Sequence, residues 1–301
     1  MSRPVNGSSP LIVVFIDDQD WHLRMLRAAF SAAGATLLPV RLSDCGLDTT
    51  QPYGLLIPGL DGRLPDGVLV RAVAGGSFES VTIRLGVLHA LHAMGVPVWN
   101  SVGAIERCVD KSMTSFLLQH SGLPTPPSWT VPGRDAALAI AHRELVQERL
   151  VLKPLFGSQG KGLTMIARAE DLPPPEEVND VYYLQRFIPA HGRGYEDYRL
   201  FVCDGEVIAA MIRRADDWIT NIRQGAIPSA LTPDADMCDL AVRAAQAVGA
   251  AYAGVDLIRN PEGQFMVLEV NSMPGWRGLQ QVVSYPIAEQ LASRMLASLR
   301  R

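Results

Sequence analysis

The first hundred residues alternate between short apolar runs and one-sided helical patterns. Apolar runs at 11–16 and 36–40 flank a helical pattern over 21–33 that ends at Gly34. The alternation continues with a predicted strand at 54–57, an apolar run at 68–73, a predicted helix over 80–94 and a predicted strand at 96–99. Strands that alternate with helices are typical of an open α/β sheet. The first strand leads into the acidic residues 17–20 instead of a glycine-rich turn, which argues against a dinucleotide-binding dehydrogenase.

A second domain follows, in which hairpins replace the regular alternation. Asp110 can cap a helix that Gly122 and the prolines after it terminate. Strands are predicted at 150–153, 181–188, 199–203 and 206–212, and a helix over 232–248. The Asp-Gly pair between the third and fourth of these strands favours a type I′ turn. We therefore predict an α/β protein, with an open parallel-sheet domain at residues 1–104 and an α+β domain at residues 105–301.

The segment 255–271 predicts a hairpin whose end carries oxygen ligands. Apolar residues alternate on both sides of residues 261–264, as expected for two strands joined by a turn. With that turn, Asp256 and Glu269 fall opposite each other, and Asn271 shares the face of Glu269. Two carboxylates and an amide suit a magnesium ion that bridges nucleotide phosphates better than they suit zinc. A polar hairpin end with solvated carboxylates is the alternative for this segment taken alone.

A glycine-rich loop follows the predicted strand that ends at Lys153. Glycine lets backbone N–H groups approach phosphate oxygens closely, and the lysines add positive charge. The candidate phosphate-binding residues are Lys153, Gly157, Ser158, Gln159, Gly160, Lys161 and Gly162. The spacing is not that of a Walker loop, because Gly162 stands where serine or threonine would hold magnesium. A flexible hairpin tip is the alternative.

Further cationic residues accompany these two segments. Lys111 lies at the N-terminal end of its predicted helix, where its charge would add to the helix N–H groups in binding phosphate. Arg199, Arg213 and Arg214 lie on or just beyond the strands of the Asp-Gly hairpin, where guanidinium groups can clamp a carboxylate or stabilise a transferring phosphoryl group. Neighbouring residues of a strand face opposite sides, so we expect only one of Arg213 and Arg214 in the site. We favour Arg214 and predict that Arg213 is a surface charge.

Composition limits the classes of partner. The chain has 301 residues, 48% of them hydrophobic and 19% charged, which is ample material for a folded core. A net charge of −4 with dispersed lysines and arginines argues against nucleic acid as a partner. The N-terminus lacks a hydrophobic leader, and the first apolar run is too short to cross a membrane, so we expect a cytoplasmic protein without a membrane partner. The oligomeric state is left open, a homo-oligomer included.

Taken together, these segments resemble the ATP-grasp carboxylate–amine ligases, most closely the RimK-like glutamate ligases. The resemblance rests on the order of DKSMTSFLLQHSGLPTPP, VLKPLFGSQGKGL, YLQRFIP, DYRLFVCDGEVIAAMIRRA, TNIRQGA and GVDLI…LEVNSMPGWRGL, and it spans about residues 110–280. It implies a pre-ATP-grasp domain at 1–104 and a two-lobed ATP-grasp domain at 105–301. The small lobe would cover about residues 105–185 and the large lobe about residues 186–301.

The resemblance also implies how ATP would be bound. Its nucleotide-binding residues would be Lys111, Lys153, the loop residues 157–162, the hinge residues Gln185, Arg186, Phe187 and Ile188, Asp197 and Asn221. The hinge would hold adenine through backbone groups. Arg186 stands where an acidic residue is common in the family, so its side chain departs from the pattern. Asp197 would bind the ribose, with Glu196 as a rival because the loop before it is longer than usual.

The implied activity is an ATP-dependent amide ligase. Asp256, Glu269 and Asn271 would hold Mg²⁺ or Mn²⁺, and Lys153 and Arg214 would act in catalysis. A carboxylate would attack the γ-phosphate of ATP to give an acyl phosphate and ADP, and an amine would then displace phosphate to leave an amide. This scheme requires no covalent nucleophile from the protein, in agreement with histidines that are dispersed along the chain.

The substrates follow from the same resemblance. It points to L-glutamate as the amine and to a one-carbon carrier cofactor of the tetrahydromethanopterin or methanofuran type as the carboxylate acceptor. The candidate substrate residues are Arg71, Ser77, Arg84, Arg199, Arg223 and Trp276. Arg71 or Arg84 would pair with a carboxylate and Trp276 would offer a flat surface to a ring, whereas surface charges and a packed aromatic are the alternative. Glutamylation of a protein C-terminus and a non-catalytic ATP-binding regulatory module stay open as other functions.

Overall fold

The computed structural model describes residues 9–157, 160–192 and 194–299. The chain forms two compact units, which we describe separately. The first unit comprises residues 1–105, 250–252 and 273–301, and the second comprises residues 106–249 and 253–272. Within the described ranges, no helix is long and apolar enough to cross a membrane.

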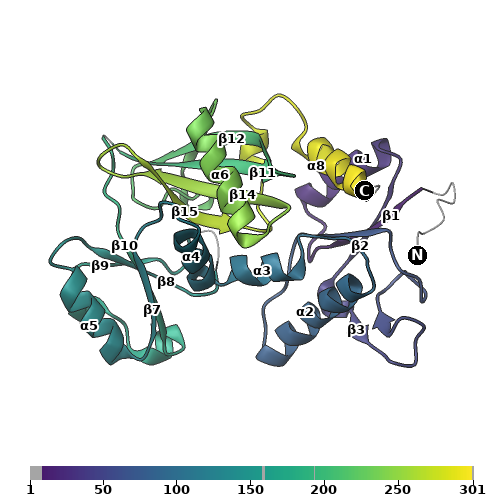
Figure 1. The fold of residues 1–301 in the computed structure, drawn as a ribbon, viewed down its shortest axis with the longest axis horizontal. Helices are drawn as coiled ribbons and strands as arrows, with labels where there is room; N and C mark the ends of the chain where they lie inside the picture. The colour runs from purple at the N-terminus through teal and green to yellow at the C-terminus, as the bar shows by residue number, and fades with distance from the viewer. Residues whose placement is uncertain (1–8, 158–159, 193, 300–301) are drawn as a thin grey trace. The chain divides into compact units, whose positions relative to one another are not determined.

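The first unit is built on a four-stranded sheet with the order β2-β1-β5-β6, and Figure 1 labels two of these strands, β1 and β2. Its paired strands run parallel, as the alternation of strands and helices predicted. Its elements are β1 (Leu11–Phe15), α1 (Trp21–Ala32), β2 (Thr36–Val40), η1 (Leu42–Asp44), β3 (Gly46–Leu47), β4 (Leu55–Leu56), β5 (Gly67–Val70), α2 (Phe78–Ala93), β6 (Val98–Trp99), α7 (Arg277–Gln280) and α8 (Ile287–Ser298). The predicted strand at 54–57 does not join this sheet, because β4 pairs with β3 in a separate two-stranded ladder.

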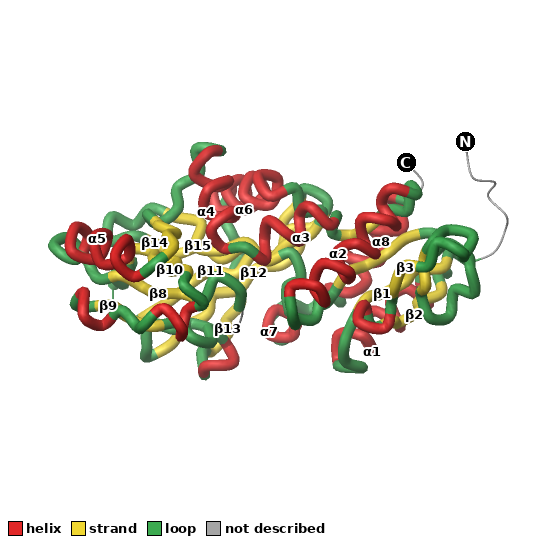
Figure 2. The backbone as a smooth tube through the Cα atoms, turned by 90° about the horizontal axis from the view of Figure 1, so that it is seen from below, coloured by secondary structure: helices red, strands yellow, loops and turns green. Residues whose placement is uncertain are grey.

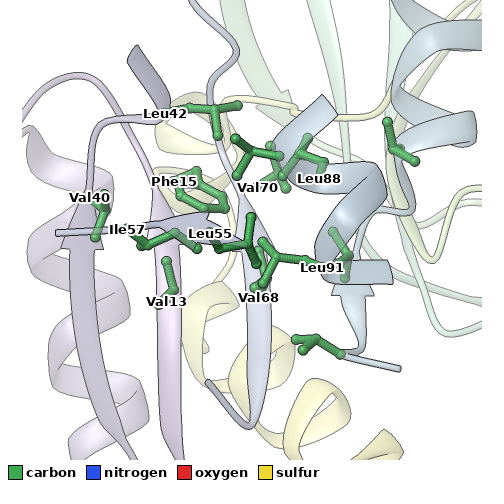
Figure 3. Close-up of a cluster of buried hydrophobic side chains, with 14 of the residues drawn as sticks. Val13, Phe15, Val40, Leu42, Leu55, Ile57, Val68, Val70, Leu88 and Leu91 are labelled. Atoms are coloured by element: carbon green, nitrogen blue, oxygen red, sulfur yellow. The ribbon is translucent and has the colours of Figure 1, made fainter. Parts of the chain in front are cut away.

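The core of the first unit lies on one face of the parallel sheet (Figure 3). Val13 and Phe15 of β1 meet Val68 and Val70 of β5, and all four side chains are fully buried. Leu88 of α2 packs against the same cluster. The continuous apolar runs of the sequence therefore correspond to strands that are buried on both faces, as expected of a parallel sheet.

The C-terminal segment corrects the predicted domain boundary. Residues 273–301, which the sequence assigned to the second domain, belong to the first unit. Figure 1 shows α8, in yellow, beside α1, in purple. Leu291 and Met295 of α8 are fully buried. A side chain at Gly67 would meet Met295 at 3.2 Å, so the helix packs directly against β5. Burial of this apolar helix face holds the C-terminus on the first unit.

The second unit contains two sheets, with the strand orders β7-β10-β8-β9 and β13-β12-β11-β14-β15. Its elements are α3 (Val102–Val109), which begins in the first unit, α4 (Lys111–His120), β7 (Ser128–Pro132), α5 (Arg134–Glu144), β8 (Leu150–Lys153), β9 (Thr164–Ile166), η2 (Ala169–Asp171), η3 (Pro175–Val178), β10 (Val181–Arg186), β11 (Tyr195–Cys203), β12 (Glu206–Ala215), η4 (Ile222–Gln224), β13 (Ile227–Ala230), α6 (Ala235–Val248), β14 (Tyr252–Arg259) and β15 (Phe265–Asn271). The chain passes from the four-stranded to the five-stranded sheet between β10 and β11.

Helices α4 and α6 pack together and against the five-stranded sheet. Figure 2 shows the two helices side by side, and both contact β15. Asp110 caps α4 by accepting from the N–H of Ser112 at 2.8 Å, and Asp234 caps α6 by accepting from the N–H of Met237 at 2.8 Å. Capping of this kind fixes where a helix begins. The Asp110 cap thereby places Lys111 at the start of α4.

Candidate functional site

A cavity in the second unit gathers residues from both of its sheets and from α4. The predicted site residues that line it are Lys111, Lys153, Gly157, Gly160, Lys161, Gln185, Arg186, Phe187, Ile188, Glu196, Asp197, Asn221, Asp256 and Glu269. Gly162, Arg199, Arg214, Arg223 and Asn271 belong to the same unit but do not line the cavity. Ser158 and Gln159 lie outside the described residues. The cavity therefore brings the predicted phosphate, adenine and carboxylate residues together.

Two lysines meet at one side of the cavity. Lys111 donates from Nζ to the carbonyl oxygens of Gly157 at 2.9 Å and Leu155 at 3.3 Å, so it ties α4 to the start of the glycine-rich loop. Burial lowers the pKa of Lys153; the charge of Glu269 opposes the shift, that of Lys111 adds to it, and the resulting pKa is about 8. Burial also lowers the pKa of Lys111. Burial makes the charged form of these lysines unfavourable, and the negative charges of a polyanionic ligand would stabilise it again. The cavity is therefore suited to such a ligand.

The glycine-rich loop approaches its neighbours too closely for other residues. Gly160 has φ +70°, and a Cβ there would lie 2.5 Å from Oδ1 of Asn221. Gly162 has φ +71°, and a Cβ there would lie 2.8 Å from Cγ of Pro154. Both positions need glycine for conformation and for space. This contact also brings the predicted Asn221 beside the loop.

The hairpin β14–β15 places the predicted metal ligands as the sequence indicated. Asp256 pairs with Glu269, and Asn271 pairs with Gly254 one step along the same face. The loop between the strands is longer than the predicted turn, since Arg259 pairs with Phe265, and a register shift next to Asp256 restores the predicted alignment. The longer loop and the register shift therefore compensate each other, and Asp256 still lies opposite Glu269.

The donor set of this hairpin fits magnesium. Among the described residues, no three His, Cys, Asp or Glu side chains gather as a metal cage. Magnesium needs no such cage, because it binds through one or two carboxylates and takes further oxygens from substrate phosphates. Asp256 and Glu269 supply the two carboxylates, and both contribute to the electrostatic field at Lys153, where phosphates would lie.

A buried network of alternating charges surrounds Asp256. Arg199 donates from Nε to Oδ1 of Asp256 and from Nη2 to Oδ2 at 2.6 Å. Arg213 contacts the same Oδ2 from Nη2 at 3.1 Å and also donates to both oxygens of Asp197, from Nε at 2.6 Å. Thr220 donates to Asp197 at 2.7 Å. Burial alone would raise the pKa of Asp256, but the two guanidinium groups outweigh it and hold that pKa below its ordinary value.

The choice between the two neighbouring arginines is the reverse of the prediction. Arg213 is buried and lines the cavity, whereas the side chain of Arg214 is 53% exposed and lies 3.2 Å from Glu196. The register explains the error. A shift between Phe201 and Val202 pairs Asp197 with Arg213 and Glu196 with Arg214. Arg213 thus shares the face of Asp197 and Asp256, so it is the arginine that a ligand in the cavity would meet.

The four predicted hinge residues line the cavity, and the side chains of three of them contact other residues. Gln185 is buried, with its Nε2 3.4 Å from the hydroxyl of Tyr183. Arg186 forms an ion pair with Glu144 of α5 at 2.5 Å, which accounts for a basic residue at this position. The ring of Phe187 packs edge-on against Trp218. That the hinge backbone binds adenine stays a prediction.

The two candidates for the ribose differ in exposure. Asp197 is 3% exposed and belongs to the buried charge network. The side chain of Glu196 is 39% exposed, and it accepts from the hydroxyl of Tyr198. Both line the cavity. Glu196 is therefore the carboxylate that a solvent-borne ligand reaches more readily.

The predicted acceptor residues of the first unit do not form an open site. Trp276 is 0% exposed, so it cannot offer a surface to a ring, and the packed-aromatic alternative is correct. Its ring packs edge-on against His22 and lies 4.6 Å from the guanidinium of Arg71. Arg71 also donates from Nη2 to the carbonyl oxygen of Pro274 at 2.7 Å. Arg71 and Trp276 thus stabilise the turn that follows β15 in the sequence.

Arg84 and Ser77 are likewise engaged with backbone groups. Arg84 donates from Nη1 to the carbonyl oxygens of Ala74 at 2.7 Å and Gly75 at 2.6 Å. Ser77 caps α2 by accepting from the N–H of Ser80 at 3.2 Å. Arg223 lies in η4 of the second unit and is exposed. Of the predicted acceptor arginines, Arg223 is the one with an exposed side chain.

Several cavity residues were not predicted from the sequence. They are Val151, Pro154, Leu163, Ala190, His191, Tyr195, Arg213, Trp218, Ile219, Thr220, Ile258, Arg259 and Leu268. Among them, His191 has its Nδ1 3.0 Å from the carbonyl oxygen of Pro261 at the tip of the β14–β15 hairpin. The signal that could have identified Thr220 is its position next to Asn221.

Comparison with known proteins independently supports the family and the fold that the sequence predicted. A family model described as the RimK-like ATP-grasp domain matches residues 108–295. The chain is 36% identical to a tetrahydromethanopterin:alpha-L-glutamate ligase of Methanococcus maripaludis, over 67% of this chain and 70% of the relative. It is 30% identical to the protein of the same name in Methanosarcina acetivorans, over 89% of this chain and 92% of the relative. The ATP-grasp ligase PsnB, solved with precursor peptide PsnA2 and AMPPNP, shares the fold, with a TM-score of 0.71 at 22% identity over 99% of this chain and 100% of PsnB.

Proposed function

The chain belongs to the RimK-like ATP-grasp family and is a ligase, and from this premise we propose that it joins L-glutamate to the carboxylate of a one-carbon carrier cofactor at the expense of ATP. The observation that carries the proposal is the convergence of Lys111, Lys153, Asp256 and Glu269 on one cavity. Curated relatives named as tetrahydromethanopterin glutamate ligases support the choice of substrates.

Each group of cavity residues has its own role in the proposed reaction. Lys111 and Lys153 bind the phosphates of ATP, and the hinge backbone near Phe187 binds adenine. Asp256 and Glu269, with Asn271, would hold Mg²⁺, which would supply charge screening for the phosphates. The acceptor carboxylate attacks the γ-phosphorus to form an acyl phosphate and release ADP. The glutamate amine then attacks the acyl carbon, expels phosphate and loses a proton, leaving an amide.

Two assignments follow the geometry instead of the first expectation. Arg213, which faces the cavity, replaces Arg214 as the cation that stabilises the transferring phosphoryl group. Glu196, with its exposed carboxylate, is proposed for the ribose hydroxyls, while Asp197 holds Arg213. Lys153 keeps its predicted place beside the phosphates.

The test is a direct assay of the product. The purified protein would be incubated with ATP, Mg²⁺, glutamate and a tetrahydromethanopterin- or methanofuran-type cofactor that bears a free carboxylate. Mass spectrometry should show a cofactor heavier by one glutamyl residue, with ADP released in equal amount. Extension of a peptide C-terminus without cofactor glutamylation would replace the cofactor by a protein acceptor. ATP binding without ADP release for any acceptor would indicate a regulatory module.

A further inference from the structure

The carboxylate of Asp256 is held by two arginines in different ways. Arg199 grips it at two points, with Nε on Oδ1 and Nη2 on Oδ2 at 2.6 Å. Arg213 touches it at one point, with Nη2 3.1 Å from Oδ2. Two parallel contacts fix the plane of a carboxylate, whereas a single longer contact does not. Arg199 therefore orients Asp256, and Arg213 only neutralises it.

Arg213 has a second and stronger attachment. Its Nε and Nη2 both donate to Asp197, and Asp197 is itself held by the hydroxyl of Thr220 at 2.7 Å. The side chains of Arg213, Asp197 and Asp256 are 4%, 4% and 5% exposed. Arg213 can consequently give up its contact with Asp256 and stay neutralised by Asp197, without leaving a buried charge unpaired.

The two arginines also differ in their position relative to the cavity. Arg213 lines it together with Asp256 and Glu269, whereas Arg199 is not one of the described residues that line it. A cation that enters from the cavity approaches Asp256 on the side where Arg213 stands. Two cations on one carboxylate oxygen repel each other strongly in a buried site, so the single contact of Arg213 is the one that yields.

We infer that Arg199 is a positioning residue that fixes Asp256 for a divalent cation, and that Arg213 is an exchangeable counter-ion that occupies Asp256 until the cation displaces it toward Asp197. This inference rests on the metal site of the proposed function. It gives separate roles to the two arginines that pair with the carboxylate assigned to metal binding. It also makes Arg213 available to the transferring phosphoryl group only in the metal-loaded protein.

The two arginines should therefore affect metal affinity in opposite directions. Arg199→Lys keeps the charge and loses the two-point contact, so Mn²⁺ affinity should fall about tenfold, as is usual when the partner of a metal ligand is altered. Arg213→Met removes the competing cation, so Mn²⁺ affinity should rise by about threefold or more while ligase activity is lost. Arg214→Met, in an exposed pair with Glu196, should leave Mn²⁺ affinity unchanged.

The measurement is titration of Mn²⁺ by electron paramagnetic resonance, with saturating ADP so that no turnover occurs. Thermal unfolding checks that each variant is folded. Because Arg213→Met leaves Asp197 buried without its partner, Asp197→Asn combined with Arg213→Met serves as a second variant and should also bind Mn²⁺ more tightly.

Glu269→Gln separates the inference from the site on which it depends. If Glu269→Gln abolishes Mn²⁺ binding while Arg199→Lys and Arg213→Met shift affinity in the same direction, the division between the arginines is wrong and the metal site stands. If Glu269→Gln leaves Mn²⁺ binding unchanged, both the metal site and the inference are overturned. Opposite shifts, with binding lost in Glu269→Gln, support both.

Discussion

The two units use the same residue types for different purposes. In the second unit, Arg199 and Arg213 face carboxylates, and Arg213 lines the cavity. In the first unit, Arg71 and Arg84 donate to backbone carbonyl oxygens and Trp276 is fully enclosed. A guanidinium that holds a carbonyl oxygen fixes a loop, whereas one that balances a buried carboxylate beside a cavity can respond to a charged ligand. The surroundings of a residue, more than its type, distinguish a binding site from a structural contact.

The largest expected effect is a loss of catalysis caused by a change in the second unit. Glu269→Gln should lower kcat at least about 1000-fold, because it removes a charge that balances the cation at the phosphates without removing volume. The fold should survive, since Glu269 is only half-buried. Steady-state rates at limiting and saturating Mg²⁺ measure the effect.

Glu262→Gln is the matched control, because Glu262 is exposed at the tip of the same hairpin. Its rates should equal those of the unchanged protein. A Glu269→Gln variant that kept near-normal turnover at limiting Mg²⁺ would show that the carboxylate is not a metal ligand.

The next largest effect concerns the first unit, where we expect a change to lower the stability of the fold and not the rate of the reaction. Trp276→Ala removes a fully buried ring that packs against His22 and Arg71, and should lower the free energy of unfolding by about 3 kcal/mol. Denaturant unfolding measures the loss. Phe78→Ala, at a side chain that is 83% exposed in the same unit, should change it by less than about 0.5 kcal/mol. A stable Trp276→Ala variant with a raised KM for the acceptor would restore the predicted ligand role.

Much of the fold could be predicted from apolar periodicity. The parallel sheet, the Asp-Gly hairpin and the helix capped by Asp110 lie where the sequence indicated. Periodicity is a local signal, and it is reliable where an element buries one continuous face. Periodicity did not identify α8 as part of the first unit, and it placed the strand at 54–57 in the parallel sheet. A sequence pattern does not say against which sheet an element packs.

Most residues of the site could be predicted from the sequence, but the strand register that places them could not. Both hairpins that carry charged site residues contain a register shift, one beside Phe201 and one beside Asp256. A shift of one residue moves side chains to the other face of a strand, and with the observed register Arg213, not the predicted Arg214, lies opposite Asp197. The pairing of Asp256 with Glu269 was correct because a longer loop and a shift compensate each other. Such shifts have no clear signature in a single sequence.

A smaller effect concerns pH and the nucleotide. Burial and Lys111 lower the pKa of Lys153 to about 8, so its charge is present below that pH and is lost as the pH rises through it. Bound phosphates favour the charged form, so ATP binding should take up a proton near pH 8 and weaken as the pH increases further. Calorimetry in buffers of different ionisation enthalpy detects the proton.

Lys153→Met is the variant that isolates this group. It should weaken ATP binding by about 10- to 100-fold, the usual contribution of a charged hydrogen bond, and should remove the pH dependence. Lys161→Met is the comparison variant: Lys161 lines the same cavity but is exposed, so its loss should leave the pH dependence of ATP binding in place. An unchanged pH dependence in Lys153→Met would place the titrating group elsewhere.

The smallest expected effect is on the acceptor, and it compares an arginine from each unit. Arg84→Met removes the donor to Ala74 and Gly75, so it should lower stability while changing the KM for the acceptor less than about threefold. Arg223→Met removes an exposed guanidinium from η4, so it should raise that KM by about tenfold with little change in stability. Steady-state titration of the acceptor at saturating ATP and glutamate gives both values. The reverse pattern, a raised KM in Arg84→Met alone, would mean that the carbonyl contacts of Arg84 open to admit the acceptor carboxylate, and that the first unit binds substrate after all.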